Sequence, residues 1–455
     1  MYITAEDTEV TEKNVRDWVR QFNNELRTHY VELDTYYNGR DKLNKVQTEL
    51  DKSTKRTIND IHVNYARMIV NNACGYFMGK PVSYEIKNKD FDKAVRELLW
   101  RNDEQAENME LAKTASRFGV AYELMALNND KNVYIKSLSP LNTFFVVDNT
   151  ILQEKICAIT YWTRKTSDNK AKTIGYVYTK DEIRKFEGDD AYTFDEPETN
   201  PFKPCIPVFE FWNNDEHTGD YENVTEILSA YSKLISANFD DIDSIANAIL
   251  AFINAELNKD DAKEFKKSRI VQILGENADV KYLEKHLDKE FVQYLREAIR
   301  DDIFSITHIP DLTDNSFSGV KSGEALSYKL IGFENLRLIK QNYFEKGLYQ
   351  RLTCFMNYKK LKNTVVEIPE GDVTITFYAN LPKNIDKDRQ IAELYGKGVI
   401  SRRTAIDKIE IVDDTEEEIK RIEDEMPDVG DINGLESLND DEEENGKRKA
   451  ERGIS

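Results

Sequence analysis

The stretch from Glu222 to about Glu256 repeats its apolar residues at alternating intervals of four and three. That spacing is a heptad seam, and a helix is the regular structure whose period fits it. A helix of about 35 residues, at ~1.5 Å per residue, reaches roughly 50 Å. Because a compact domain does not need that length, we expect the helix to project from the body or to pack against copies of itself. The residues expected to pack along the seam are Leu228, Ile235, Ile242, Ile245 and Ile249.

The seam is interrupted at its middle by Asn238, with Asp240, Asp241 and Asp243 close by. A polar residue at an inward position can set the register of packed helices at a cost in stability. A solvated gap in the seam explains the same residues. The sequence leaves both interpretations open.

A compact insert and a second helix follow. The insert, 257–287, contains short apolar runs at 270–274 and 280–283, which predict strands. Residues 288–307 have the apolar spacing of a returning helix. The insert also carries a basic cluster, which predicts a docking face for an acidic partner unless the lysine stems only cover apolar surface. The cluster consists of Lys263, Lys266, Lys267 and Arg269.

The loop 308–321 is rich in Asp, Asn, Ser, Thr and Gly, which are typical of exposed irregular backbone. It is longer than most connections between helices, and such loops are more often functional. His308 opens the loop, which permits a functional role for this residue. A helix C-terminus also favours histidine for dipole reasons alone, so the sequence leaves both explanations open. Ser322 is the predicted N-cap of a long helix that runs to Lys362.

The remaining patterns predict a mixed α+β fold that is rich in helix. Helical spacing is found at 7–30, 59–79 and 90–117, and segments of period two recur between 121 and 212. The latter predict an antiparallel sheet. A strand at 372–380 is expected to return to that sheet. Helices are expected again at 386–395 and at 401–408, the second with Ser401 as its N-cap.

The chain is acidic, with 84 Asp and Glu against 63 Lys and Arg and a net charge of -21. Proteins that bind DNA tightly neutralise phosphates with Lys and Arg. The charge therefore argues against a repressor or a nuclease. Residues 413–455 hold 17 acids and 6 bases, which predicts a solvated, disordered end. Whether that end has a further role stays open.

Neither catalysis nor a metal or cofactor site is predicted. The four cysteines are scattered singly and the five histidines are dispersed, so no ligand spacing emerges. The string GVKSG at 319–323 lacks the residue order of a phosphate-binding loop. No apolar run has the length of a membrane span, and the N-terminus lacks a signal-peptide pattern. We expect the protein to stay in the cytoplasm in which it is made, without a membrane partner.

Five segments, taken in order, resemble the portal proteins of long-tailed bacteriophages, and the likeness runs from about residue 10 to 420. They are FEFWNN (209–214), GDYENV (219–224), ISANFDDIDSIANAIL (235–250), DDIFSITHIPD (301–311) and SGEALSYKLIGFENLRLIK (322–340). The resemblance implies a ring-forming portal fold. Its parts would be a mixed α/β wing (1–221), a descending stem helix (222–256), a small α/β clip (257–287), an ascending stem helix (288–307), a tunnel loop (308–321), a long wing helix with returning strands (322–383), a helical crown (384–425) and an acidic tail (426–455).

The resemblance also implies a non-enzymatic function. A dodecameric ring at one capsid vertex would be the channel for packaging and ejection of double-stranded DNA. Its partners would be the terminase large subunit, head-completion or adaptor proteins, and the major capsid and scaffolding proteins. The protein would be assembled in the host bacterial cytoplasm and reside in the virion. The tunnel-loop residues implied to face DNA are Thr313, Asn315, Ser316, Phe317, Ser318 and Lys321. Lys321 would touch phosphate, unless it only lies beside the cap of the next helix.

Two other classes compete with a portal. A head-tail adaptor or coiled-coil ring that does not conduct DNA would also use the seam, but it gives no reason for the insert or the loop. An enzyme of the packaging machinery would need a phosphate loop or clustered metal-binding carboxylates, and the sequence pattern reveals neither.

Overall fold

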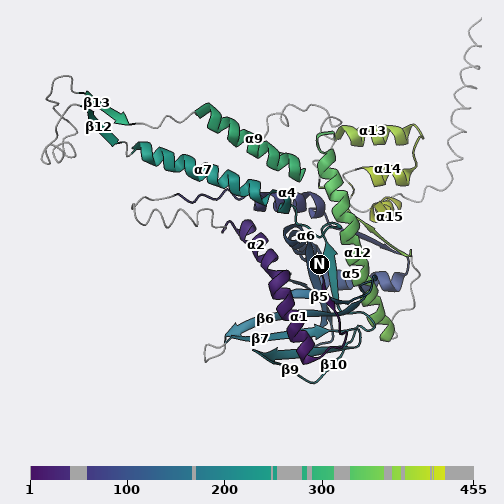
Figure 1. Cartoon of the computed structure of the whole chain (residues 1–455). Helices are drawn as coiled ribbons and strands as arrows, with labels where there is room; N and C mark the ends of the chain where they lie inside the picture. Colours follow the sequence, from purple (N-terminus) through teal and green to yellow (C-terminus); the bar gives the residue numbers. More distant parts are fainter. Residues whose placement is uncertain are drawn as a thin grey trace, which may run out of the picture. The chain divides into compact units, whose positions relative to one another are not determined.

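The computed structural model describes residues 2–40, 59–165, 171–246, 249–253, 279–283, 289–311, 328–362, 371–380, 385–409, 412 and 415–425. The fold is mixed α/β and helix-rich, as predicted (Figure 1). The chain divides into two compact units. Unit 1 consists of Met1–Gly319 and Leu326–Asn380, and unit 2 consists of Val320–Ala325 and Leu381–Ser455.

The largest sheet of unit 1 is antiparallel apart from one edge, where β1 runs parallel to β5. Its strand order is β1 (Ile3–Ala5), β5 (Thr143–Asp148), β6 (Lys155–Lys165), β7 (Ala171–Tyr178), β8 (Glu182–Gly188) and β10 (Glu198–Thr199), while β9 (Tyr192–Phe194) also pairs with β8. The helix expected at 7–30 is two helices, α1 (Glu12–Glu25) and α2 (Arg27–Asn38), which meet at Leu26. Phe22 of α1 stacks on Phe144 of β5 with ring centroids 4.5 Å apart, so α1 packs on this sheet.

A second sheet supports the helical part of unit 1. Its order is β11 (Val208–Trp212), β3 (Val120–Leu127) and β4 (Val133–Leu138). Helices α4 (Tyr65–Met78), α5 (Lys89–Arg101), α6 (Glu104–Phe118) and α12 (Ile331–Leu361) belong to the same unit. Helix α12 packs directly on β11. Gly347 permits this close approach, because a Cβ there would lie 2.5 Å from Phe211 Cδ1.

The strand expected at 372–380 does not join either of these sheets. It forms β14 (Val373–Thr376), which pairs antiparallel with β2 (Ser83–Ile86) in a sheet of their own. The prediction that it returns to the same sheet is therefore wrong. Alternation along a strand specifies a buried face, but it does not specify which strand lies alongside.

The helix that carries the heptad seam is shorter than predicted. A 3-10 turn, η1 (Glu222–Val224), leads into helix α7 (Thr225–Ala246), and strand β12 (Ile249–Ile253) begins three residues later. Strand β12 pairs antiparallel with β13 (Asp279–Leu283), and helix α9 (Lys289–Thr307) follows. A continuous apolar run such as ILAFI fits a buried helical turn and a strand equally well. In the structure this run pairs with β13, so it is a strand.

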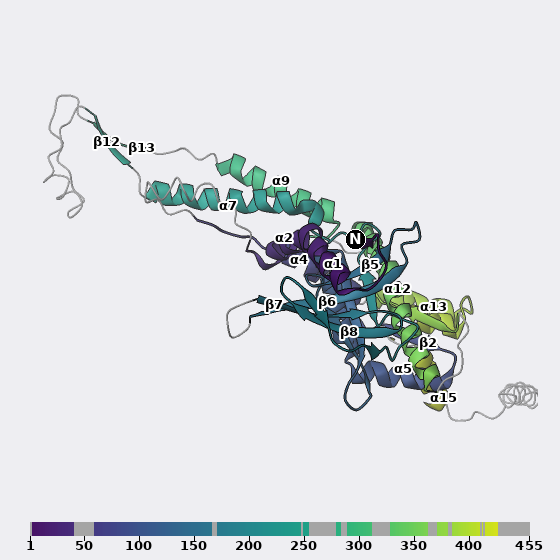
Figure 2. The same cartoon turned by 60° about the horizontal axis from the view of Figure 1, so that its bottom comes forward.

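Helices α7 and α9 lie side by side and lead to the β12–β13 hairpin (Figures 1 and 2). Unit 2 contains α13 (Ile385–Gly396), α14 (Arg402–Lys408) and α15 (Thr415–Glu425). The predicted cap is confirmed, because the Ser401 side chain accepts a hydrogen bond from the Thr404 N–H. The expected acidic tail, 426–455, lies outside the described residues.

Candidate functional site

Helix α7, which packs against α9, carries four of the five predicted seam residues. Residues 59–64 run along α7, and alternate backbone N–H groups of this segment donate to polar side chains one helical turn apart. Two residues of extended chain cover ~6.6 Å and four helical residues ~6 Å, so the two repeats match. The pairs are Asn59 to Asp240 Oδ1 (2.8 Å), Ile61 to Ser236 Oγ (2.9 Å) and Val63 to Ser232 Oγ (3.3 Å).

Aromatic and polar contacts join α7 to α9. Arg296 Nε donates to Tyr231 Oη at 3.0 Å. Tyr65, at the start of α4, packs edge-on against Tyr231 (5.2 Å between centroids) and against Phe304 of α9 (6.0 Å). The pair α7/α9 is therefore fixed to α4 at its base, where Tyr231 is buried.

Burial along α7 falls from its start toward its end. Leu228 is 5% exposed and Ile235 is half-buried, whereas Ile242 is 57% exposed. Ile245 lies in α7, and Ile249 lies in β12 rather than in the predicted helix. The side chains of these last two residues are outside the described part of the structure. Among the seam side chains that the structure describes, packing within one copy therefore covers Leu228 and part of Ile235 but leaves Ile242 exposed.

Large apolar side chains on the pair remain exposed beyond that base. They are Phe239 (49%), Ile242 (57%), Phe291 (60%) and Tyr294 (67%). Two of them belong to α7 and two to α9. The two helices lie side by side, and large exposed apolar patches are typical of a surface that another chain covers.

The end of α9 is anchored to the rest of unit 1. His308 adopts a left-handed conformation with φ of 56° and ends the helix. Ile309 is 1% exposed, and Asp311 Oδ2 lies 3.5 Å from Arg300 Nε. The predicted DNA-facing residues Thr313, Asn315, Ser316, Phe317, Ser318 and Lys321 lie outside the described residues. The same holds for the predicted docking residues Lys263, Lys266, Lys267 and Arg269.

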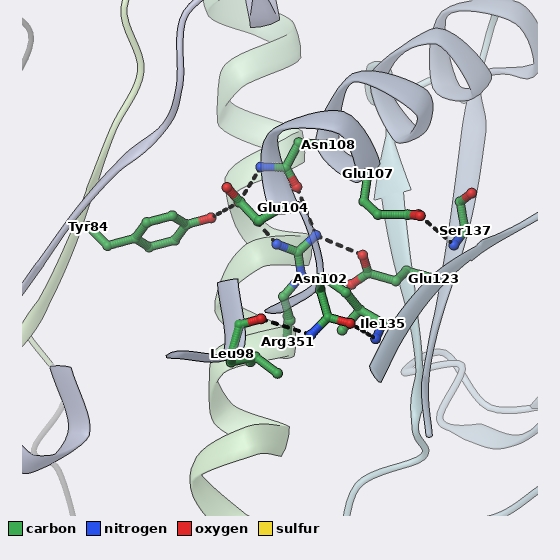
Figure 3. A network of polar contacts seen from close by, with 10 residues as sticks. All are labelled: Tyr84, Leu98, Asn102, Glu104, Glu107, Asn108, Glu123, Ile135, Ser137 and Arg351. Atoms are coloured by element: carbon green, nitrogen blue, oxygen red, sulfur yellow. Dashed lines mark hydrogen bonds and ion pairs between the residues drawn. The ribbon is translucent and has the colours of Figure 1, made fainter. Parts of the chain in front are cut away.

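A buried ionic network holds α12 to the core (Figure 3). Arg351 is fully buried and donates to both oxygens of Glu123, at 2.7 and 2.8 Å. It also donates to Glu104 (3.2 Å) and to Asn108 (2.9 Å), and Tyr84 donates to Glu104 (2.5 Å). Burial raises the pKa of Glu123, whereas the facing guanidinium acts in the opposite direction. Glu123 comes from β3 and Glu104 from α6, so one side chain joins three elements.

A second buried pair links α12 to the start of the helix pair. Lys340 Nζ lies 2.6 Å from Asp220 Oδ2, and both side chains are nearly inaccessible. Asn213 and Ser116 also hydrogen-bond with this carboxylate. Because Asp220 directly precedes Tyr221 and η1, the pair fixes α12 to the entrance of α7. The pair is costly to break, because removal of either partner would leave a buried charge without its counter-charge.

Sequence reasoning missed both buried cations, although their spacing contained a signal. Lys340, Phe344, Leu348, Arg351 and Phe355 follow one another at intervals of four or three, so the two cations occupy the apolar face of α12. A charge on such a face requires a partner in the core. The partners come from distant parts of the sequence, and the pattern does not reveal them.

The structure brings together two of the four cysteines that the sequence presents singly. Asn357 Nδ2 donates to Cys205 Sγ at 3.1 Å. A hydrogen bond from the buried Cys354, together with the one from Asn357, lowers the pKa of Cys205 to about 6 against the opposing effect of burial. Among the described residues, no group of three or more His, Cys, Asp or Glu side chains is arranged to hold a metal ion. None of the described helices combines the length and apolarity needed to cross a membrane.

Comparison with known proteins identifies the class as that of phage portal proteins. The family model described as phage portal protein, SPP1 Gp6-like, matches residues 17–428. The portal protein of Bacillus phage SPP1 is 22% identical over 432 residues, covering 88% of this chain and 83% of that protein. The portal protein of Clostridium phage phiCD119 is 21% identical over 426 residues, covering 84% and 89%. The chain belongs to the SPP1 Gp6-like family of phage portal proteins.

Two solved structures are similar at 12% sequence identity. One is described as the neck of an empty gene transfer agent (GTA) particle computed with C6 symmetry; it has a TM-score of 0.44 and covers 74% of this chain and 87% of that chain. The other is described as the virion of a native gene transfer agent particle, with a TM-score of 0.46 and coverage of 82% and 91%.

Proposed function

We propose that this protein assembles as a dodecameric ring at one capsid vertex and forms the channel through which double-stranded DNA enters and leaves. Membership of the portal family supports the role. The single observation on the structure that carries the proposal is the exposed apolar surface of Phe239, Ile242, Phe291 and Tyr294 on α7 and α9. Neighbouring copies in a ring would cover this surface, because each subunit presents the same helix pair.

The charge of the chain supports a conduit rather than a binder. A net charge of -21 opposes tight association with a polyanion. Moving DNA requires weak, evenly distributed contacts, and repulsion by carboxylates keeps it from settling in one place. In this proposal the loop 308–321 forms the narrowest part of the channel. Its cation Lys321 makes one weak phosphate contact per subunit.

The remaining parts of the proposal concern location and partners. The protein is a structural component of the virion, assembled in the host cytoplasm, rather than an enzyme. The insert 257–287, through Lys263, Lys266, Lys267 and Arg269, docks the terminase large subunit and later a head-completion or adaptor protein. The wing and crown face the major capsid and scaffolding proteins. A head-tail adaptor that does not conduct DNA is the alternative function.

The assembly is tested by placing a charge on the exposed apolar surface. Ile242→Asp leaves the fold of one copy intact, because Ile242 is 57% exposed there, but buries an unpaired carboxylate wherever a neighbour covers it. We expect native mass spectrometry at micromolar protein to show loss of the ring and accumulation of folded monomer. Lys233→Asp is the matched control: Lys233 is exposed and, at ~3.6 residues per turn, lies on the opposite face of α7.

Negative-stain images then separate the two functions. A ring whose central hole is as wide as a DNA duplex supports the channel. A closed disc or a fibre supports the adaptor. Rings that form equally well from the Ile242→Asp chain and the wild-type chain would remove the observation on which the proposal stands.

A further inference from the structure

A pocket of about 390 Å³ lies between α5, the β3–β4 turn and the last turns of α12. Its floor is apolar and includes Leu98 and Phe355, and its rim carries four cations. The rim cations are Arg101, Lys131, Lys359 and Lys362, against one rim carboxylate, Glu97. Such an excess of positive charge is unexpected on a chain with a net charge of -21. The size is that of a pocket that takes a small ligand or a few side chains.

Hydrogen bonds fix the walls of the pocket relative to one another. Asn102, directly after α5, donates to the carbonyls of Leu98 and Val133 and accepts from the Ile135 N–H, which ties α5 to β4 (Figure 3). Tyr358 Oη of α12 donates to the Lys131 carbonyl at 3.3 Å. The pocket is therefore a preformed site on rigid elements, which lowers the entropic cost of binding.

The rim cations differ in how far they are neutralised. Arg101 lies 2.6 Å from Glu97 and also donates to Asn132, so this pair contributes little net charge. Lys131 and Lys362 are exposed, and within the described residues neither has an ion-pair partner. The β3–β4 turn holds Lys131 at φ of 62°, with its N–H bonded to the Asn128 carbonyl. Two exposed cations, one from the β3–β4 turn and one from the end of α12, thus remain available to an anionic ligand.

The floor disfavours a nucleic acid base as the ligand. Phe355 and Tyr358 are only 2% and 7% exposed, so their ring faces cannot receive a stacked base. Lysine ammonium groups already lie over these rings: Lys359 Nζ is 5.2 Å from the Phe355 centroid and Lys362 Nζ is 5.8 Å from that of Tyr358. Proteins that bind single strands rely on open aromatic faces. What the lining offers instead is a small apolar contact for an aliphatic group, through the few accessible atoms of Leu98 and Phe355.

Trp100 adds an independent sign of a protein contact beside the pocket. It precedes the rim residue Arg101 on α5 and is 84% exposed. Tryptophan is among the residues most enriched at the energetic centres of protein interfaces.

We propose that this pocket docks a segment of a partner protein that is acidic and carries an aliphatic side chain. The aliphatic group fills the floor at Leu98 and Phe355, carboxylates pair with Lys131 and Lys362, and the flanking chain packs on Trp100. The inference concerns α5 and the end of α12 and does not depend on the DNA channel.

The test is fluorescence anisotropy with a fluorescein-labelled peptide of glutamates around a central leucine. We expect saturable binding to the full chain, and about tenfold weaker binding to the Lys131→Glu/Lys362→Glu variant. The matched control is Lys13→Glu/Lys180→Glu, which makes the same change of charge at two exposed lysines outside the pocket. The control should bind like wild type. A peptide with serine in place of leucine should bind as weakly as the pocket variant does.

Trp100 supplies a second readout. Peptide binding should shift the tryptophan emission of the wild-type chain to shorter wavelength, and Trp100→Phe should abolish that shift. Both lysines of the pocket variant are exposed, so its thermal unfolding should match wild type.

Four outcomes would overturn the proposal. Equal binding by pocket and control variants would show a general charge effect. Competition by inorganic phosphate at the same concentration as the peptide would show a simple anion site. Tighter binding of a labelled single-stranded oligonucleotide would show a nucleic acid site. Stronger peptide binding by a chain truncated after Glu425 would show that the chain's own acidic end occupies the pocket.

Discussion

Arg351 and Lys340 show why charged residues occupy the apolar face of α12. Each faces a carboxylate from a distant segment, Glu123 for Arg351 and Asp220 for Lys340. Apolar packing at these positions would be at least as stabilising as a buried ion pair. What the ion pairs add is geometry, because a guanidinium held by both oxygens of one carboxylate permits only one rotation and register of the helix.

The Arg351 network predicts a large loss of stability when one partner is removed. Arg351→Met leaves Glu123 and Glu104 buried without their cation, and we expect the free energy of unfolding to fall by about 3–5 kcal/mol. Urea denaturation of the monomeric chain measures this. Arg20→Met, at an exposed position of α1, is the control and should change the value by no more than about 0.5 kcal/mol. A loss below about 1 kcal/mol for Arg351→Met would mean that the network is not needed for stability.

At the scale of elements, periodicity predicted helices and strands better than it predicted their ends or partners. The helices α9 and α14 and most strands of the two larger sheets match the predicted segments, whereas α4 matches only the second part of its segment. The predicted end of the α7 helix was wrong because the apolar run from Ile249 fits the period of a helix and that of a strand. In the structure this run pairs with β13 and is a strand. The partner of β14 was wrong because register depends on contacts far along the chain.

The segment 59–64 was missed as a structural element for a different reason. It was predicted as part of a helix, yet α4 begins at Tyr65 and the preceding residues run along α7. Nothing in the sequence around Ser232 and Ser236 indicates that their hydroxyl groups accept hydrogen bonds from the backbone of a distant segment. Only the match between an extended repeat and a helical turn, seen in three dimensions, explains their place.

This arrangement predicts that Ser236 stabilises the base of the helix pair. Ser236→Ala removes the acceptor of the Ile61 N–H, and we expect a loss of about 1–3 kcal/mol in local stability. Hydrogen exchange of the peptide covering 59–64 should accelerate correspondingly. Ser305→Ala, at an exposed position of α9, is the control and should leave this exchange unchanged. Unchanged exchange in Ser236→Ala would show that the segment is held by its other contacts alone.

At the scale of the whole molecule, the proposed DNA channel is consistent with the acidity of the chain. The chain carries 84 acids, and its cations lie partly in buried pairs and partly in local groups. A binder would gather cations on one surface to gain affinity from phosphate neutralisation. A conduit needs rigidity in the wall and few cations along the path. The buried anchors of α12 would supply the rigidity, and the loop 308–321 would supply the sparse contacts.

The last prediction concerns that loop. Each subunit contributes one copy, so the ring would bear a collar of small polar side chains together with Phe317 and Lys321. Deleting Asn315–Ser318 shortens the collar without touching the helix pair or the buried anchors. We therefore expect rings to form normally, while DNA retention or the completion of packaging falls. The measurement is the yield of particles that hold full-length, nuclease-protected DNA.

Two variants separate the contributions of the collar. Lys321→Gln removes the proposed phosphate contact and keeps the length of the loop, so its effect should be smaller than that of the deletion. The difference between Lys321→Gln and wild type should diminish at high salt, because salt screens the contact in the wild-type protein. The ring itself is checked by negative-stain imaging of each variant. If the deletion variant produces rings and also retains full-length genomes at normal yield, the loop is only a connector. The proposed grip on DNA would then have to reside in another part of the chain.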